Sequence, residues 1–357
     1  MKKILILLAV VTAFTACKSG SKKKGATEKS ANSEISLSAA GATFPMPFYN
    51  MAFKKYTGET GVLMTYGGIG SGGGIRSLKD KVVDFGASDA FLTDGQATEM
   101  PAPIVHIPTC MGAVVVAFNL PNIESIKLTN DALAKIFLGQ ITKWNDPELK
   151  KLNPETKFPD MAISVVHRSD GSGTTFIFSD YLTKVSPEWA EKVGKGKSLK
   201  WPVGMGAKGN PGVAGTVSQT IGAVGYIGSE YAFAQKISYA LLQNSSGNYI
   251  KPSLESVSAA AKGDIPDDTR VMLNNSSAPD AYPISGFTWI ILYKDQNYDG
   301  RSKAQAEATV KFLDWLVSPE AQSLARQVNY APLPAPAVEK AKAILRSVTY
   351  DGQPLLK

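Results

Sequence analysis

His167-Arg168-Ser169-Asp170-Gly171-Ser172-Gly173-Thr174-Thr175 is the most informative stretch of this sequence. The apolar residues 163–166 before it predict a buried strand, and apolar residues at helical spacing predict a helix over 176–185. At such a corner the first N–H groups of the helix have no partner within the helix, and the helix dipole adds partial positive charge. The backbone here is therefore suited to binding an oxyanion.

The side chains of this stretch fit the same role. Arg168 presents a planar fork of donors to an oxyanion, and Asp170 lies close enough in sequence to orient that fork. Gly171 and Gly173 let a ligand approach the backbone, and three residues supply hydroxyl donors: Ser172, Thr174 and Thr175. Taken alone, the stretch fits an ordinary turn with a Ser or Thr N-cap better than a site. Two similar segments elsewhere shift the balance toward a binding site.

Another corner of this kind lies near the start of the chain. Alternation over 35–40 predicts a strand, Gly41-Ala42-Thr43-Phe44-Pro45 follows, and apolar spacing predicts a helix over 46–56. The hydroxyl of Thr43 and the N–H of Phe44 would face any ligand at that helix end. The alternative role for Thr43 is that of a helix N-cap.

A further corner, between two predicted elements, is rich in glycine. A predicted strand over 61–66 leads into residues 67–74, which include Ser71, and a short helix is predicted over 75–78. The spacing of the glycines formally matches the dinucleotide fingerprint G-x-G-x-x-G, with Asp89 sixteen residues beyond its last glycine. The N-terminal residues of the chain predict export, and an exported protein meets no nicotinamide pool, which argues against a dinucleotide site. The glycines and Ser71 serve equally well as a nest for a small anion.

Asp89 ends a third predicted strand over 81–90. An ionised carboxylate accepts hydrogen bonds and cannot donate them, so it repels a fully ionised anion. It becomes favourable when the ligand keeps a proton, as hydrogen phosphate does near neutral pH and sulfate does not. The alternative is an exposed aspartate in a turn.

The rest of the chain predicts packing elements. We expect a strand over 111–118, a helix within 128–145, a glycine-rich connection over 201–215, a strand over 221–227, a polar, turn-rich region over 244–283, a strand over 287–293, and helices over 304–316 and 319–327. Strands that alternate with helices, without a repeat of fixed period, indicate an α/β fold with mainly parallel sheets.

The N-terminus predicts export. Lys2 and Lys3 precede an apolar run over 4–14, so residues 1–16 fit a signal peptide. Small residues before Cys17 resemble the bacterial lipobox, in which cleavage leaves a lipid-modified cysteine, and residues 17–34 then form a flexible tether. The other cysteine, Cys110, is expected in the core, and no internal disulfide can form once Cys17 is lipidated.

The charge of the chain does not indicate a nucleic-acid partner. The formal net charge is +7, but Lys2 and Lys3 contribute two of these charges, and residues 18–34 hold five lysines against two glutamates. Only two positive charges remain for the residues from 35 onward. A basic face for DNA is therefore not supported.

An enzyme is the leading alternative class. The only histidines are His106 and His167, and no zinc-hydrolase, nucleophile-elbow or Walker A motif occurs. His167 stands beside Arg168, which discourages it from accepting a proton. We expect no catalytic residue, no metal and no cofactor.

Taken together, the motifs resemble those of the periplasmic phosphate-binding proteins of bacterial phosphate ABC transporters. The matching segments are residues 41–45, 68–71, 84–89, 168–174 and 201–204, and the resemblance spans residues 36–340. It implies a two-lobed periplasmic-binding-protein clamshell of type II with two hinge crossings. The lobes would be residues 35–110 with 285–357, and residues 111–284.

The resemblance also implies the site and the partners. Hydrogen phosphate would be held by eight residues, with Asp170 orienting the arginine: Thr43, Phe44, Ser71, Asp89, Arg168, Ser172, Gly173 and Thr174. The partners would be inorganic phosphate and the permease and ATPase subunits of the transporter, with a monomer held to a membrane in the periplasm by the lipid on Cys17. The alternatives are a receptor for another tetrahedral oxyanion, such as sulfate or molybdate, and an exported phosphatase-like enzyme.

Overall fold

The computed structural model describes residues 35–356 of the chain. The predicted signal peptide over 1–16 and the tether over 17–34, including Cys17, lie outside the described residues. Within 35–356, no helix is both long enough and apolar enough to cross a membrane.

Most strands belong to one mixed sheet with the order β2-β1-β3-β12-β4-β8-β6-β7, and β9 also pairs with β4. Two small sheets have the orders β11-β10-β5 and β13-β14. The strands are β1 Ser36–Gly41, β2 Leu63–Gly68, β3 Phe85–Ser88, β4 Ile104–Phe118, β5 Lys127–Leu128, β6 Ser164–Arg168, β7 Met205–Ala207, β8 Ala223–Gly228, β9 Ser238–Tyr239, β10 Leu241–Gln243, β11 Tyr249–Ile250, β12 Ser285–Tyr293, β13 Thr349–Tyr350 and β14 Gln353–Pro354.

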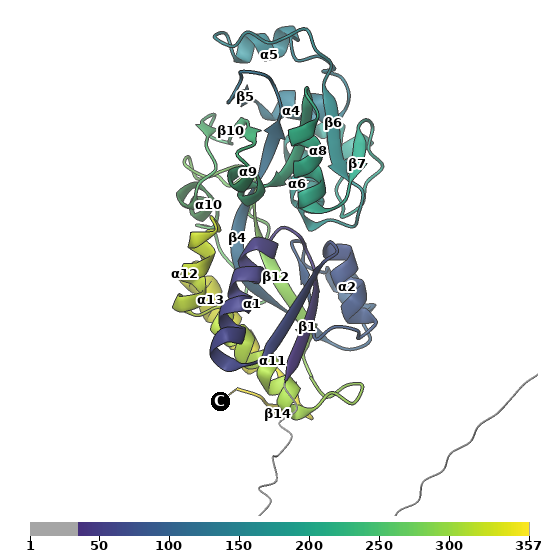
Figure 1. Cartoon of the computed structure of the whole chain (residues 1–357), viewed down its shortest axis with the longest axis vertical. Helices are drawn as coiled ribbons and strands as arrows, with labels where there is room; N and C mark the ends of the chain where they lie inside the picture. Colours follow the sequence, from purple (N-terminus) through teal and green to yellow (C-terminus); the bar gives the residue numbers. More distant parts are fainter. Residues whose placement is uncertain (1–34, 357) are drawn as a thin grey trace, which may run out of the picture. The chain divides into compact units, whose positions relative to one another are not determined.

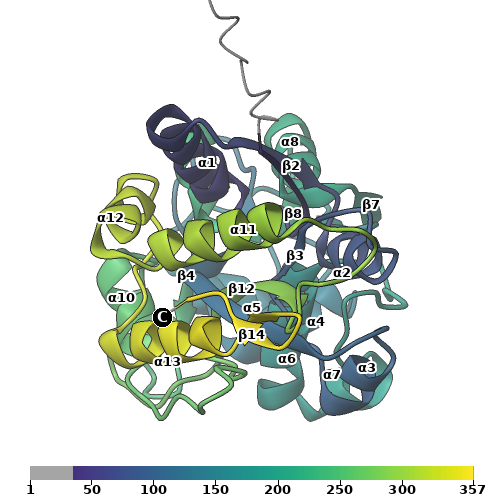
Figure 2. The same ribbon diagram turned by 90° about the horizontal axis from the view of Figure 1, so that it is seen from below.

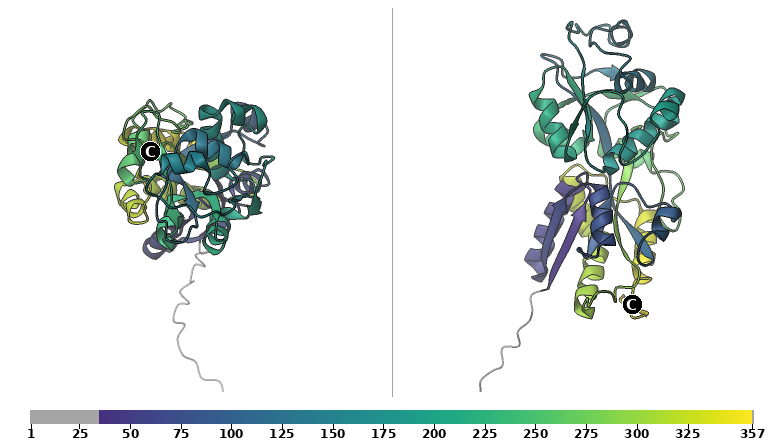
Figure 3. Two further views of the ribbon diagram at one scale, coloured as in Figure 1. Left: turned by 90° about the horizontal axis from the view of Figure 1, so that it is seen from above. Right: turned by 90° about the vertical axis from the view of Figure 1, so that its right-hand side faces the viewer.

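The long strand β4 joins two groups of elements. Residues 104–113 of β4 pair antiparallel with β12, whereas residues 114–118 pair antiparallel with β8. In the first group β1 runs parallel to β2 and β3, and in the second β6 runs parallel to β7 and β8. Figures 1 and 3 show the two groups arranged along the long axis, with β4 passing between them.

Helices pack on the strands of both groups. Helix α1 packs against β2, α2 against β1 and β3, and α8 against β6 and β8, while α11 lies beside α12 and α13 (Figure 2). The helices are α1 Met46–Thr60, α2 Ser71–Lys79, α3 Asp94–Thr98, α4 Asn130–Phe137, α5 Pro147–Leu152, α6 Gly173–Val185, α7 Pro187–Lys192, α8 Gly209–Gln219, α9 Ser229–Gln235, α10 Leu254–Ala260, α11 Lys303–Leu316, α12 Pro319–Gln327 and α13 Ala335–Arg346.

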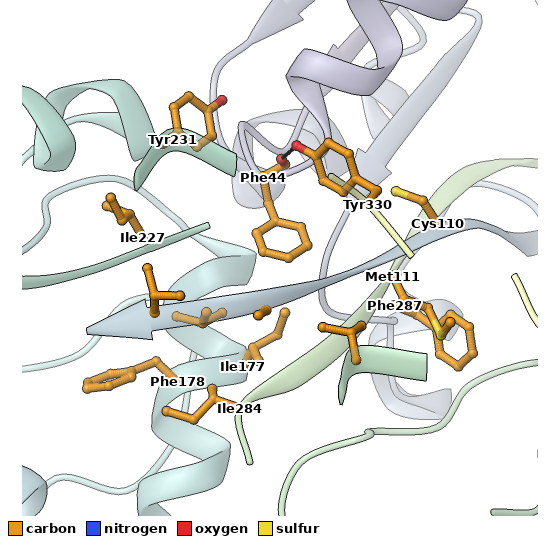
Figure 4. Packing of buried hydrophobic residues seen from close by; sticks show 14 of the residues in the cluster. Phe44, Cys110, Met111, Ile177, Phe178, Ile227, Tyr231, Ile284, Phe287 and Tyr330 are labelled. Carbon is orange, nitrogen blue, oxygen red and sulfur yellow. Dashed lines mark hydrogen bonds between the residues drawn. The ribbon is translucent and has the colours of Figure 1, made fainter. Parts of the chain in front are cut away.

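An apolar core runs through both groups, with β4 at its centre. Residues 106–118 of β4 are all buried. Figure 4 shows Phe44 packed beside β4, where its backbone carbonyl accepts a hydrogen bond of 2.5 Å from the hydroxyl of Tyr330. Cys110 is free and fully buried, which confirms its predicted place in the core. The core therefore fixes the position of the residue that follows Thr43.

The α/β class predicted from sequence is confirmed, but the sheet is mixed and not mainly parallel. Both β4 and β12 run antiparallel to their neighbours. Strand β4 also begins at Ile104, well before the predicted start at residue 111. The register shifts between Thr288 and Trp289, which pair with Cys110 and Pro108, so Thr109 forms a bulge. The bulge lets the strand include a proline, which interrupts the strand pattern in the sequence.

Two other expectations need correction. The second part of the predicted connection over 201–215 is helical, because α8 begins at Gly209. Its Pro211 lies in the first helical turn, where a missing N–H costs no intrahelical hydrogen bond. The turn-rich region over 244–283 contains α10, and α13 near the C-terminus was not predicted.

Candidate anion-binding site

The first corner holds Thr43 and Phe44 between β1 and α1. Pro45 is the N-cap residue of α1 and no side chain caps this helix, so Thr43 is not the N-cap that its sequence position also allowed. The carbonyl oxygens of Thr43 and Phe44 accept hydrogen bonds from the hydroxyls of Tyr231 and Tyr330. Within residues 35–356 no backbone acceptor takes the Phe44 N–H, which leaves this donor available to a ligand.

The second corner places Ser71 at the start of α2. Ser71 is fully buried, and its Oγ accepts the backbone N–H of Asp89 at 3.2 Å. A hydroxyl that accepts a hydrogen bond keeps its own proton to donate. The next residue, Gly72, donates its N–H to the carbonyl oxygen of Gly171 at 2.8 Å. This bond joins the second corner to the segment that contains Arg168.

Asp89 follows β3 and is 1% exposed, so it is not the exposed turn residue considered from sequence. Its Oδ1 accepts the hydroxyl of Thr288 at 2.8 Å, and its buried Oδ2 has no hydrogen-bond partner in the described chain. Burial raises the pKa of Asp89 to about 7, against the opposing effects of the Thr288 hydrogen bond and the charge of Arg168. The carboxyl therefore has one fixed oxygen and one oxygen free to meet a ligand.

Arg168 ends β6 and is locked to Asp170. Its Nε donates to Oδ1 at 2.7 Å and its second terminal nitrogen donates to Oδ2 at 2.5 Å. Oδ1 also accepts the N–H of Gly209 at 3.0 Å. Burial alone would raise the pKa of Asp170, but the hydrogen bonds and charge of Arg168 outweigh it and hold the pKa below its usual value. The pair fixes the plane of the guanidinium group.

The third corner is the N-terminus of α6. Ser172 is its N-cap, and its Oγ accepts the N–H of Thr175 at 3.0 Å. The hydroxyl of Thr174 accepts a hydrogen bond of 3.4 Å from Arg168. The hydroxyl of Thr175 instead forms a hydrogen bond of 2.6 Å with the hydroxyl of Tyr226, which gives it a partner within the protein.

Gly173 lies against the second corner and against Asp89. A Cβ atom at Gly173 would lie 2.4 Å from Oγ of Ser71 and 2.6 Å from Oδ2 of Asp89. The N-terminus of α6 therefore meets the second corner and the free carboxyl oxygen directly. All eight residues expected to hold an anion, together with Asp170, lie in one cluster of converging corners.

Two buried residues of this cluster were missed by sequence reasoning. Asn210 in α8 donates hydrogen bonds to Thr43 and Thr174, and Thr288 in β12 donates to Asp89. Asn210 lies 167 residues from Thr43 along the chain, and Thr288 lies 199 residues from Asp89. No local motif marks either residue, because their partners come from distant elements.

Both histidines lie outside the cluster. His167 stacks on Trp201, with ring centroids 4.8 Å apart. His106 accepts the N–H of Leu92 at 3.0 Å and lines a separate groove of about 860 Å³. Burial, and then the charge of Arg270, lowers the pKa of His106 to about 4. Within residues 35–356, no three His, Cys, Asp or Glu side chains are grouped so that they could hold a metal ion.

Sequence comparison places the chain among known proteins. The PBP superfamily domain model matches residues 25–320. The phosphate-binding protein PstS of Xylella fastidiosa strain Temecula1 is 39% identical over 355 residues, which cover 95% of this chain and 96% of that protein. The protein of the same name from Haemophilus influenzae is 41% identical and covers 86% of this chain and 92% of its own length. That from Methanocaldococcus jannaschii is 36% identical, with coverages of 88% and 86%.

Solved structures share the fold. A high-affinity periplasmic phosphate-binding protein bound with phosphate superposes with a TM-score of 0.69 at 21% identity, over 87% of this chain and 93% of that one. A phosphate-binding protein from Stenotrophomonas maltophilia gives a TM-score of 0.66 at 18% identity, with the same coverages. These likenesses show the arrangement of elements, and the residues of the site come from the contacts described above.

Proposed function

Because this chain belongs to the family of phosphate-binding proteins PstS, within the PBP superfamily, we propose that its converging corners bind inorganic phosphate as hydrogen phosphate. The chain is a binding protein and not an enzyme. The observation on which the proposal rests is the Oδ2 of Asp89, which is buried beside the N-terminus of α6 and its hydroxyl donors and has no hydrogen-bond partner among residues 35–356. Such a carboxyl oxygen suits an anion that still has a proton to donate.

Each residue has a role in this proposal. Arg168 supplies guanidinium donors, and Asp170 orients them. The backbone N–H groups of Phe44 and Gly173 donate directly, and four hydroxyls donate as well: Thr43, Ser71, Ser172 and Thr174. Support comes from the close approach of the Gly173 backbone to Ser71 and Asp89, and from the hydrogen bonds that join the corners. Above the pKa of Asp89, where its carboxyl is ionised, sulfate is disfavoured, because it has no proton for Asp89 and would leave two negative groups in contact.

The expected affinity is high. A hydrogen bond to a charged group is worth roughly 1.5 to 3 kcal/mol. Seven donors and one acceptor together exceed the roughly 8 kcal/mol of a micromolar complex, even after the costs of desolvation and ordering. A site built around a ligand proton can reject an analogue without that proton by roughly 10⁴- to 10⁵-fold. Micromolar or tighter binding of phosphate, with strong rejection of sulfate, follows.

Closure of the two predicted lobes around phosphate distinguishes the loaded protein from the empty one. Residues 35–110 with 285–357 would form one lobe and residues 111–284 the other. Support comes from β4, whose first part pairs with β12 and whose last part pairs with β8. Thr43, Ser71 and Asp89 come from one lobe and Arg168 from the other, so phosphate favours the closed arrangement. The closed form delivers phosphate to the permease of an ABC transporter, whose ATPase subunits drive import.

Export and anchoring complete the proposal. Residues 1–16 direct the chain out of the cytoplasm, and Cys17 receives the lipid that holds the protein at a membrane facing the periplasm. Mass spectrometry of the mature protein tests this directly, since the N-terminal peptide beginning at Cys17 should carry the added mass of a lipid on that cysteine. A Cys17→Ser variant should leave the membrane fraction. An unmodified Cys17, or a membrane fraction that retains the variant, contradicts the anchor.

The identity of a co-purified ion tests the ligand. The protein is purified without phosphate or sulfate buffers, the bound ion is released by acid, and phosphate and sulfate are quantified by ion chromatography. Stoichiometric phosphate supports the proposal. Stoichiometric sulfate or molybdate favours the alternative oxyanion receptor, and hydrolysis of a phosphomonoester by the same preparation favours the enzyme.

A further inference from the structure

Asn210 occupies a position that the anion ligands do not explain. It is fully buried at the start of α8, and its backbone N–H and side chain make four hydrogen bonds. Its backbone N–H and its Nδ2 both donate to Oγ1 of Thr43 at 3.0 Å, and Nδ2 also donates to Oγ1 of Thr174 at 3.0 Å. One side chain therefore contacts two hydroxyls that come from different corners of the site.

The orientation of the Asn210 amide is fixed by its fourth bond. The backbone N–H of Gly228 donates to Oδ1 of Asn210 at 2.9 Å. A backbone N–H can only donate, so the atom that it meets must be the amide oxygen. The NH₂ group then has to face the two threonines. The opposite amide orientation would place two donors against each other at Gly228.

This geometry decides which way the threonine hydroxyls point. A hydroxyl has one proton and two lone pairs. Thr43 Oγ1 accepts from both the backbone N–H and Nδ2 of Asn210, and Thr174 Oγ1 accepts from Nδ2 and from Arg168. On each of the two Oγ1 atoms both lone pairs therefore accept a hydrogen bond, so each hydroxyl can act toward a ligand only as a donor. No acceptor for either proton is found among residues 35–356.

We infer that Asn210 is a positioning residue that turns the hydroxyls of Thr43 and Thr174 into obligate donors to the bound anion. The inference rests on the proposed function, because phosphate supplies the missing acceptor for both protons. Without Asn210 each hydroxyl is free to present a lone pair to the ligand, and a lone pair repels an anion. The residue acts through the two threonines, and contact with phosphate is not required of it.

A double-mutant cycle separates this role from simple packing. Phosphate affinity is measured by calorimetry on the full chain for the wild type, Asn210→Ala, the Thr43→Val and Thr174→Val pair, and the triple variant. We expect Asn210→Ala to weaken binding roughly 10- to 100-fold in the wild type and less than roughly threefold when both threonines are already valine. Equal effects in the two backgrounds would overturn the inference.

The isosteric variant Asn210→Asp tests the polarity. Its carboxylate accepts hydrogen bonds and would draw the threonine protons away from the anion, so we expect weaker binding than in Asn210→Ala. Thermal unfolding of each variant without phosphate reports on folding. Binding by Asn210→Asp equal to that of the wild type would overturn the inference. If wild-type protein binds no phosphate, the proposed function fails instead, which distinguishes the two failures.

A measurement on the wild type does not depend on whether variants fold. When phosphate is bound, the hydroxyl protons of Thr43 and Thr174 should both show scalar coupling to phosphorus in a proton–phosphorus NMR correlation spectrum. Coupling from both hydroxyls is the expected result. Wild-type protein that binds phosphate but shows no such coupling from either threonine would overturn the inference.

Discussion

The hydroxyl of Thr288 donates a hydrogen bond of 2.8 Å to Oδ1 of Asp89, whereas Oδ2 of the same carboxyl has no partner in the part of the chain that the structure describes. Thr288 lies on β12 and Asp89 follows β3, two strands that pair antiparallel in the first group. The carboxyl is thus held at one oxygen by the scaffold and presented to the site by the other. This arrangement lets a single acidic residue distinguish a protonated anion from a fully ionised one.

Replacing Asp89 with asparagine should narrow the gap between phosphate and sulfate. Because the Thr288 hydroxyl donates to the inner oxygen, the amide of Asp89→Asn should turn its NH₂ group toward the ligand. That group donates to any oxyanion and needs no ligand proton. Calorimetry with both anions on the wild type and the variant measures the change. An unchanged ratio of the two dissociation constants would refute the proton-acceptor role of Asp89.

The pKa of Asp89 predicts a pH dependence of stability without phosphate. Its pKa in the folded protein is about 7, raised from the usual 3.8. Between these values the folded chain binds more protons than the unfolded chain, so the contribution of Asp89 to the unfolding free energy is lost as the pH rises from 4 to 7. The slope from one such group is at most about 1.4 kcal/mol per pH unit.

Denaturant titrations from pH 4 to pH 7 on the wild type and Asp89→Asn isolate this effect. The buried His106 is present in both proteins and cancels in the difference, whereas Glu230 cancels only in part, because the charge of Asp89 contributes to its raised pKa. The stability of the wild type relative to the variant should decline steadily across the window. A difference that does not vary with pH would show that the carboxyl is not protonated in the folded state.

Replacement of Arg168 should weaken phosphate binding more than replacement of any other residue of the site. Arg168→Ala takes away the guanidinium donors and leaves Asp170 without its partner, so phosphate affinity should fall by at least roughly 100-fold. Arg168→Lys keeps the charge but cannot reproduce the fork, and an intermediate affinity is expected. Arg346→Ala removes the same charge from the exposed end of α13 and serves as the control. Unchanged affinity in Arg168→Ala would reject the assigned site.

A methyl group at Gly173 should block the site without unfolding the protein. In Gly173→Ala the new carbon would lie 2.4 Å from Oγ of Ser71 and 2.6 Å from Oδ2 of Asp89, distances that real contacts do not reach. The corners must separate, and phosphate affinity should fall at least roughly 100-fold, since several hydrogen bonds to the anion lengthen together.

Gly215→Ala is the matched control for this substitution. Gly215 lies on α8, where an added Cβ meets no atom within 4 Å. Calorimetry should find its phosphate affinity unchanged, and its thermal stability should be equal to or slightly above that of the wild type. Normal binding by Gly173→Ala would mean that the corners are not as close in the functional protein.

The corners of the site were predictable because each is marked locally. Thr43, Ser71, Asp89 and Arg168 all stand where a predicted strand gives way to a glycine-bearing turn or a helix, and the structure places them together. Asn210 and Thr288 were not predictable, since they act through partners 167 and 199 residues away. For the same reason the antiparallel course of β12 between β3 and β4 leaves no periodic signal in its own sequence.

Glycine and proline caused the errors in secondary structure. Helix α8 begins with Gly209, Asn210 and Pro211, residues typical of loops, yet its later residues pack on β6 and β8. Pro108 likewise interrupts the strand pattern in the sequence, so the first part of β4 was not predicted. In the structure the bulge at Thr109 accommodates the proline within the strand. In both cases tertiary packing outweighs local propensity.

The most direct test of the central claim is calorimetric titration of the ion-free wild-type protein with phosphate and, separately, with sulfate at a pH of about 8.5, above the pKa of about 7 of Asp89. We predict a dissociation constant for phosphate of roughly 1 μM or below, and binding of sulfate weaker by roughly 10⁴-fold or more. Equal affinity for the two anions, or no binding of phosphate, would contradict the claim that Asp89 selects an anion that still has a proton to donate.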